Sequence, residues 1–148
     1  MEVVWKVCAT VVNCWLNRSV TLHDALHGFR AGRSTGTVTL EAKLAQHLTG
    51  IAHEPLLQVF LDVREAYNSL DRGWCMEILK GYRMVHNTAR LISHHLDKLI
   101  FVPKASRFLG IDFGTGRGVM QGNPASPMIF NIVVDVVARA VLEVVCGP

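Results

Sequence analysis

The sequence predicts an α+β fold that is rich in helix. Apolar residues recur at helical spacing in several long segments, which predicts amphipathic helices. A short apolar run at 56–62 follows Pro55 and predicts a buried strand, with two further short strands expected beside it at 99–103 and 107–112. Half of the 148 residues are hydrophobic, which is enough for one packed core, so a single domain spanning 1–148 is expected.

Capping residues and prolines place the ends of the expected helices. Ser34 or Thr35 can cap the second helix, and Asp71 can cap the third. Pro124 and Pro127 suit the first turn of the last helix, because proline needs no hydrogen-bond donor there. In chain order, helices are therefore expected at 3–17, 35–50, 72–81, 86–99 and 124–145.

Two helix faces are predicted from side-chain spacing. In the second helix, leucines recur every four residues and form an apolar stripe of Leu40, Leu44 and Leu48. In the last helix, Asp135, Arg139 and Glu143 recur at the same interval, which predicts one polar stripe along the helix. Such a stripe argues against a membrane span, so no membrane partner is expected.

Composition favours an intracellular protein that can contact phosphate. The net charge is +3, with ten arginines against five lysines, and arginine binds phosphate in a bidentate manner. The four cysteines show no paired spacing and are expected to be free thiols. No secretory leader is visible, because Lys6 interrupts the first apolar run. A location in the nucleus or cytoplasm is expected.

The segment HDALH, from His23 to His27, has the histidine spacing of zinc proteases. Its acid is Asp24 rather than glutamate, Gly28 follows at once, and no third ligand stands out. We therefore expect no zinc site here.

The loop GFRAGRS at 28–34 combines two glycines with Arg30 and Arg33. Glycines let a backbone approach phosphate closely, and arginines donate charge-assisted hydrogen bonds to it. The same composition also fits an ordinary solvated turn, so two interpretations stay open.

Asp62 ends the expected strand, and two interpretations fit its position. A carboxylate beside a core strand needs a partner, and a hard cation such as Mg²⁺ is one candidate. The other interpretation is that Asp62 caps the helix that follows. Tyr67, five residues later, could place a flat ring beside whatever a metal at Asp62 holds.

Three segments occur in series: GFRAGRST at 28–35, VFLDVREAY at 59–67 and GVMQGNPASPMIFN at 118–131. In this order and spacing they resemble a reverse transcriptase of the non-LTR retrotransposon or group II intron type. The resemblance implies the partial fingers and palm of a right-hand polymerase, with fingers at about 1–55 and palm at about 56–148.

The resemblance also implies a site and an activity. The activity is RNA-directed DNA synthesis by nucleotidyl transfer with two Mg²⁺ ions, an RNA template, a DNA primer and a deoxynucleoside triphosphate. The matching positions are Asp62 as catalytic metal ligand, the carbonyl of Val63 as a further ligand, Tyr67, Gln121 and Gly122 at the nucleotide, and Arg30 and Arg33 at nucleic acid.

The sequence departs from the family pattern in two ways. Asn68 and Asn123 replace frequent aspartates, and Ala125 replaces a usual leucine. More importantly, no YxDD hairpin occurs before Pro148, so Asp62 offers one carboxylate where the mechanism needs three. We therefore expect the chain to be inactive alone. The alternative is a non-catalytic remnant of a transposable element with at most weak nucleic-acid binding.

Overall fold

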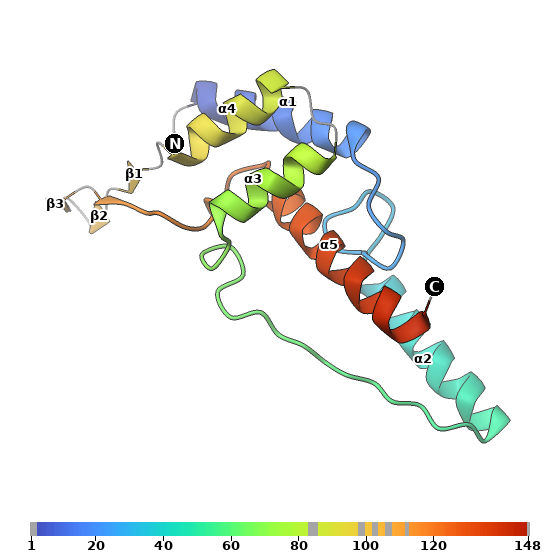
Figure 1. The fold of residues 1–148 in the computed structure, drawn as a ribbon. Helices are drawn as coiled ribbons and strands as arrows, with labels where there is room; N and C mark the ends of the chain where they lie inside the picture. The colour runs from blue at the N-terminus through green and yellow to red at the C-terminus, as the bar shows by residue number, and fades with distance from the viewer. Residues whose placement is uncertain are drawn as a thin grey trace.

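The computed structural model describes residues 3–82, 86–97, 100–101, 104–105, 108–111 and 113–147. Within these residues the chain forms five α-helices and four very short strands (Figure 1). The helices are α1 (Val3–Ser19), α2 (Thr35–Ala52), α3 (Arg72–Gly81), α4 (His86–Asp97) and α5 (Ser126–Cys146). The five predicted helices are confirmed with slightly shifted ends, although residues 98–99 of the fourth prediction lie outside the described residues.

The predicted α+β fold is wrong, because the described chain is mainly helical. Its largest sheet has two strands of two residues each. The strands are β1 (Ile100–Phe101), β2 (Lys104–Ala105), β3 (Phe108–Leu109) and β4 (Phe113–Gly114). β1 pairs with β4 and β2 with β3, both antiparallel. Residues 102–103, 106–107 and 112 of the predicted strands lie outside the described residues.

The predicted strand at 56–62 is extended but has no strand beside it among the described residues. An apolar run identifies a segment that favours an extended backbone, whereas a strand also needs a partner to complete its hydrogen bonds. The strands expected beside it are wrong partners, because in the described residues β1 to β4 pair only with one another. The partial fingers-palm arrangement expected from the resemblance is therefore not formed by the described residues.

The core lies where α1, α3, α4 and α5 meet (Figure 1). Leu16 of α1, Leu79 of α3 and Ile132 of α5 are fully buried, and Leu96 of α4 is nearly so. These side chains come from segments up to more than a hundred residues apart, so the core depends on long-range packing. α5, with 21 residues, is the longest described helix, and it contributes Met128, Ile129, Ile132 and Val133 to this core.

Asp135 corrects the predicted polar stripe of α5, because its side chain is fully buried. Its carboxylate accepts hydrogen bonds from the His23 backbone N–H at 2.6 Å, the Tyr82 hydroxyl at 2.5 Å and the Arg139 Nε at 2.7 Å. Burial acts to raise the pKa of Asp135, but the hydrogen bonds from Arg139, Tyr82 and His23 outweigh it and the pKa lies below its ordinary value. One carboxylate thus joins α5 to the end of α3 and to the loop after α1.

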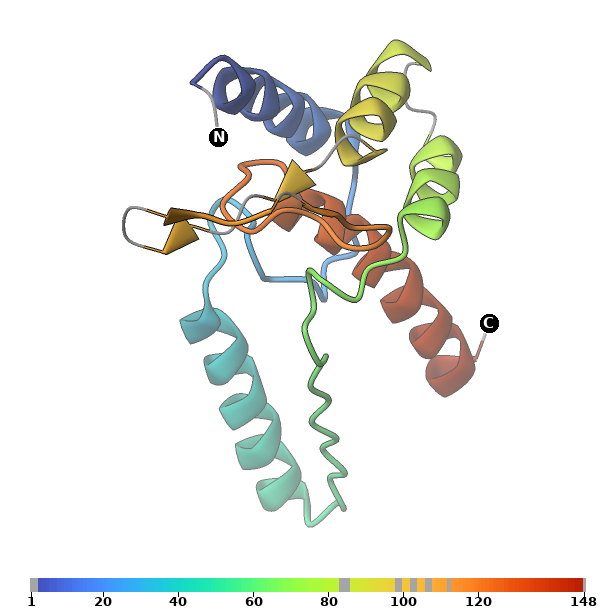
Figure 2. The same cartoon turned by 90° about the vertical axis from the view of Figure 1, so that its left-hand side faces the viewer.

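We call α2 together with residues 54–63 the arm, because this part projects from the other helices (Figure 1 and Figure 2). α2 begins with a capping box at Ser34 and ends at His53 in the left-handed conformation. It has no buried residue, so the predicted leucine stripe is exposed to solvent rather than packed. None of the helices in the described ranges is both long and apolar enough to cross a membrane.

Asp135→Ala should destabilise the fold by about 3 kcal/mol, because it removes the acceptor for three hydrogen bonds and leaves Arg139 without its buried partner. Urea unfolding followed by circular dichroism measures the change. Glu143→Ala, on an exposed position of the same helix, is the matched control and should change stability by less than about 0.5 kcal/mol. Equal stability of the two variants would show that Asp135 does not hold the helices together.

Candidate functional site

Two of the three motif segments meet in space at Gly118. Its backbone N–H donates to the Leu70 carbonyl at 2.8 Å, and the Val119 N–H donates to the Tyr67 carbonyl at 2.9 Å. Gly118 has a φ of +84°, and a Cβ there would lie 2.9 Å from Asn68 Cα. Only glycine fits this close approach without strain. The contact joins the segment after Asp62 to the loop before α5.

Arg72 holds the same loop from the side of α3. Its guanidinium donates to the Gly118 carbonyl at 2.8 Å, the Thr115 carbonyl at 2.5 Å and the Arg117 carbonyl at 3.1 Å. Burial lowers the pKa of Arg72, and the charge of Asp97 opposes that shift. Sequence reasoning missed this residue. The available signal was an arginine in the first turn of a helix, where the helix dipole disfavours a cation unless it has other partners.

A pocket opens beside this junction. It is lined by Tyr67, Gly122, Asn123, Pro124, Ser126 and Pro127. The Tyr67 ring packs edge-on against Phe130, with ring centroids 5.5 Å apart, and burial raises the pKa of its phenol. Of the three predicted nucleotide residues, Tyr67 and Gly122 therefore share one pocket. Gln121 is exposed next to Gly122 and is not among the lining residues.

Asp62 and Val63 do not line the Tyr67 pocket, and both are exposed in the arm. Within the described ranges, no group of three histidine, cysteine or acidic side chains could hold a metal ion. One exposed carboxylate and a neighbouring carbonyl supply oxygen donors, but they cannot balance two Mg²⁺ ions. The donor set in the described chain therefore does not fit a two-metal centre.

The basic loop is held by its own arginines. Arg30 Nη1 donates to the carbonyls of His23 and Leu26, at 2.8 and 2.9 Å, and Arg33 pairs with Asp24 at 2.6 Å. The two arginine side chains are only 22% and 26% exposed. A structural role is thus visible for both, while their contact with nucleic acid stays a prediction.

The loop is also fixed to α5, because Asn131 Nδ2 donates to the Gly28 carbonyl at 2.6 Å. Asn131 is buried, so this bond joins the first and third motif segments in the interior. Gly28 of the first segment, Tyr67 of the second and the third segment therefore lie together at the first turns of α5.

The histidines of HDALH have other partners. His23 Nδ1 accepts from the Ala25 N–H at 3.1 Å. His27 lies 3.1 Å from the Thr37 hydroxyl and 3.3 Å from Glu41 through its two ring nitrogens. The His23 ring therefore contacts its own loop, and the His27 ring contacts the first turns of α2. The absence of a zinc site stays a prediction.

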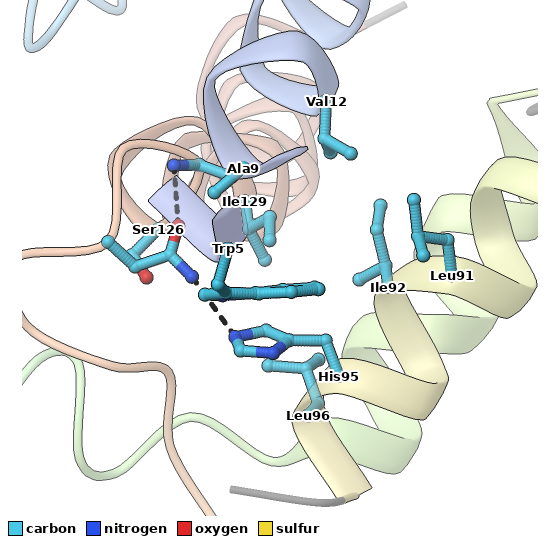
Figure 3. A pocket seen from close by; sticks show the side chains of 11 residues that line it. Trp5, Ala9, Val12, Leu91, Ile92, His95, Leu96, Ser126 and Ile129 are labelled. Carbon is cyan, nitrogen blue, oxygen red and sulfur yellow. Dashed lines mark hydrogen bonds between the residues drawn. The ribbon is translucent and has the colours of Figure 1, made fainter. Parts of the chain in front are cut away.

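A partly buried aromatic pair joins α1 to α4 (Figure 3). Trp5 stacks on His95 with ring centroids 3.7 Å apart, and His95 Nε2 lies 3.1 Å from Asn123 Nδ2. Because an amide nitrogen only donates, Nε2 must accept, which requires a neutral imidazole. Burial, with a smaller contribution from the charge of Arg72, lowers the pKa of His95 to about 4.

No protein-family model matches the sequence, and no curated protein matches it either.

His95 should make stability fall as the pH drops. The unfolded chain binds a proton near pH 6.5, whereas the folded chain binds it only near pH 4. The stabilisation is therefore complete above pH 6.5 and is lost between pH 6.5 and 4. Urea unfolding across this range should show a smaller pH dependence for His95→Gln than for the natural chain. His94→Gln, at an exposed neighbouring position, should keep the natural slope, and an unchanged slope in His95→Gln would contradict this assignment.

Proposed function

We propose that the chain is a fragment of the reverse transcriptase type that binds a deoxynucleoside triphosphate at the Tyr67 pocket and does not polymerise by itself. The observation that carries the proposal is the meeting of Tyr67 and Gly122 in one pocket. These residues belong to two separate motif segments, and the backbone bonds between 67–70 and 118–119 bring those segments together.

The pocket combines two features that suit a nucleotide. The Tyr67 ring offers a flat apolar surface on which a base or sugar can lie. Ser126 and Pro127 of the first turn of α5 line the same pocket, and no side chain caps this helix start. The positive end of the helix dipole therefore faces the pocket and favours a phosphate group. Neither feature alone would indicate a ligand, but together they match the two ends of a nucleotide.

Gly122 suits the approach of such a ligand. Its φ is +81°, and a Cβ built there would meet nothing within 4 Å. The glycine is thus required by its backbone conformation, while the space in front of it is open. A ligand can approach the backbone there without meeting a side chain of Gly122.

Catalysis is not assigned to the described residues. Asp62 is exposed in the arm, and the metal donors around it are too few for two Mg²⁺ ions. RNA template and DNA primer belong to the same proposal as partners of a longer polymerase. For them, Arg30 and Arg33 would have to exchange their present contacts within the loop for contacts with phosphate.

Titration of the 148-residue chain with 2′-deoxyadenosine triphosphate, in the absence of magnesium, tests the pocket. Tyr67→Phe keeps the ring and should bind like the natural chain. Tyr67→Ala should weaken binding roughly tenfold, because stacking on an aromatic ring contributes about 1–3 kcal/mol per base. Circular dichroism of both variants separates lost binding from lost folding.

A second ligand checks the phosphate end. Deoxyadenosine without phosphates should bind about two- to fivefold more weakly, because it cannot use the helix dipole. Equal triphosphate affinity for a folded Tyr67→Ala variant and the natural chain would overturn the proposal. Absence of triphosphate binding by the natural chain would overturn it as well.

A further inference from the structure

The arm exposes a large apolar surface. In residues 54–63, the side chains of Leu57, Phe60 and Leu61 are each almost 90% exposed. On α2, all of the larger apolar side chains are exposed as well: Val38, Leu40, Leu44, Leu48 and Ile51. A contiguous apolar patch of this kind usually marks an interaction surface.

The extended part of the arm also has an unused backbone. No backbone N–H or carbonyl of residues 55–63 pairs with another backbone group of the described chain. An extended, apolar segment with free donors and acceptors is a template for pairing with another strand. The missing partner is therefore a strand rather than a small molecule.

We propose that a second copy of this chain covers the arm, through antiparallel pairing of residues 55–63 about a two-fold axis at Val59. This proposal does not rest on the nucleotide pocket, since none of the residues that line that pocket lies in 54–64. The occupant is chosen by the charges that flank the apolar run.

The charges at the two ends are complementary in this register. Glu54 lies five residues before Val59 and Arg64 five residues after it. In an antiparallel pair centred on Val59, Glu54 of one copy lies opposite Arg64 of the second copy, and the contact occurs twice. Glu54 and Arg64 are exposed and have no ion-pair partner among the described residues.

A parallel pair in register has the opposite property. It would set Glu54 beside Glu54 and Arg64 beside Arg64, and like charges facing each other destabilise a strand pair. Between Glu54 and Arg64, the charged Asp62 would face its own copy as well, whereas in the antiparallel register it faces Leu56. The charge pattern thus selects the antiparallel arrangement.

In this dimer, α2 of both copies lies on the same face of the paired strands. Gln58 faces α2, because its Oε1 accepts a hydrogen bond from Gln46 Nε2 at 2.7 Å. Side chains alternate along a strand, so Leu56 and Phe60 would share that face once the segment pairs as a strand. The two-fold axis of an antiparallel pair is perpendicular to the ribbon, so it places α2 of both copies over the same face. Pairing can therefore bury exposed leucines of both helices together with Phe60.

Sedimentation equilibrium of the full chain at low salt tests the proposal, since exposed charge pairs are strongest there. The natural chain should form a dimer. Glu54→Lys and Arg64→Glu should each weaken dimerisation by about tenfold, because each turns two attractive contacts into repulsive ones. Because the two variants change opposite charges of the same contact, they should weaken dimerisation to a similar extent.

Mixing the two single variants is the decisive experiment. In the mixed dimer Lys at 54 faces Glu at 64, and the natural Arg64 faces the natural Glu54, so affinity should return to that of the natural chain. The double variant Glu54→Lys/Arg64→Glu should also dimerise normally. A natural chain that stays monomeric, or that forms large aggregates, would overturn the proposal. So would a dimer that is unaffected by either single variant, or a mixture that does not recover.

Discussion

The buried carboxylate of Asp135 is the interaction on which the rest of the structure depends. It accepts three hydrogen bonds from donors at positions 23, 82 and 139, so one side chain fixes the loop after α1, the end of α3 and a turn of α5. Burial of a charge is expensive unless it is paired and hydrogen-bonded, and both conditions are met here. Tyr82 reports the same environment, because burial and then the bond to Asp135 raise its pKa to about 12. Arg139 supplies the compensating charge from a half-exposed position.

The consequences of this bond reach the motif segments. The loop that carries Arg30 is fixed at His23 by Asp135 and at Gly28 by Asn131, and both anchors lie on α5. The first turns of α5 also border the Tyr67 pocket, and Arg72 of α3 donates a hydrogen bond to the Gly118 carbonyl in the loop before α5. Gly28 of the first segment, Tyr67 of the second and the third segment are thus all held near the first turns of α5. The arm lies outside that region, which explains why α2 has correct helix caps but no buried residue.

Local features were predictable from the sequence, and long-range ones were not. Helix positions followed from apolar spacing, and the caps at Ser34 and Asp71 followed from residue type. The spacing of Asp135, Arg139 and Glu143 predicted a polar stripe, but not that Asp135 is buried and pairs with a half-exposed Arg139. That outcome depends on His23 and Tyr82, which lie far away in sequence. The prediction of a strand at 56–62 is wrong for the same reason, because an apolar run does not determine which segment will pair with it.

The candidate site shows the same division. Tyr67, Gln121 and Gly122 could be singled out by motif, but only the structure shows that Tyr67 and Gly122 share a pocket and Gln121 does not line it. Asp135 thus organises a stable body from which the arm projects. Hydrogen exchange on the monomeric chain tests it directly. The His23 amide should be protected as strongly as the amides in the middle of α5, and those of α2 far less. A His23 amide that exchanges as fast as an exposed loop, or an α2 protected as strongly as α5, would contradict the account.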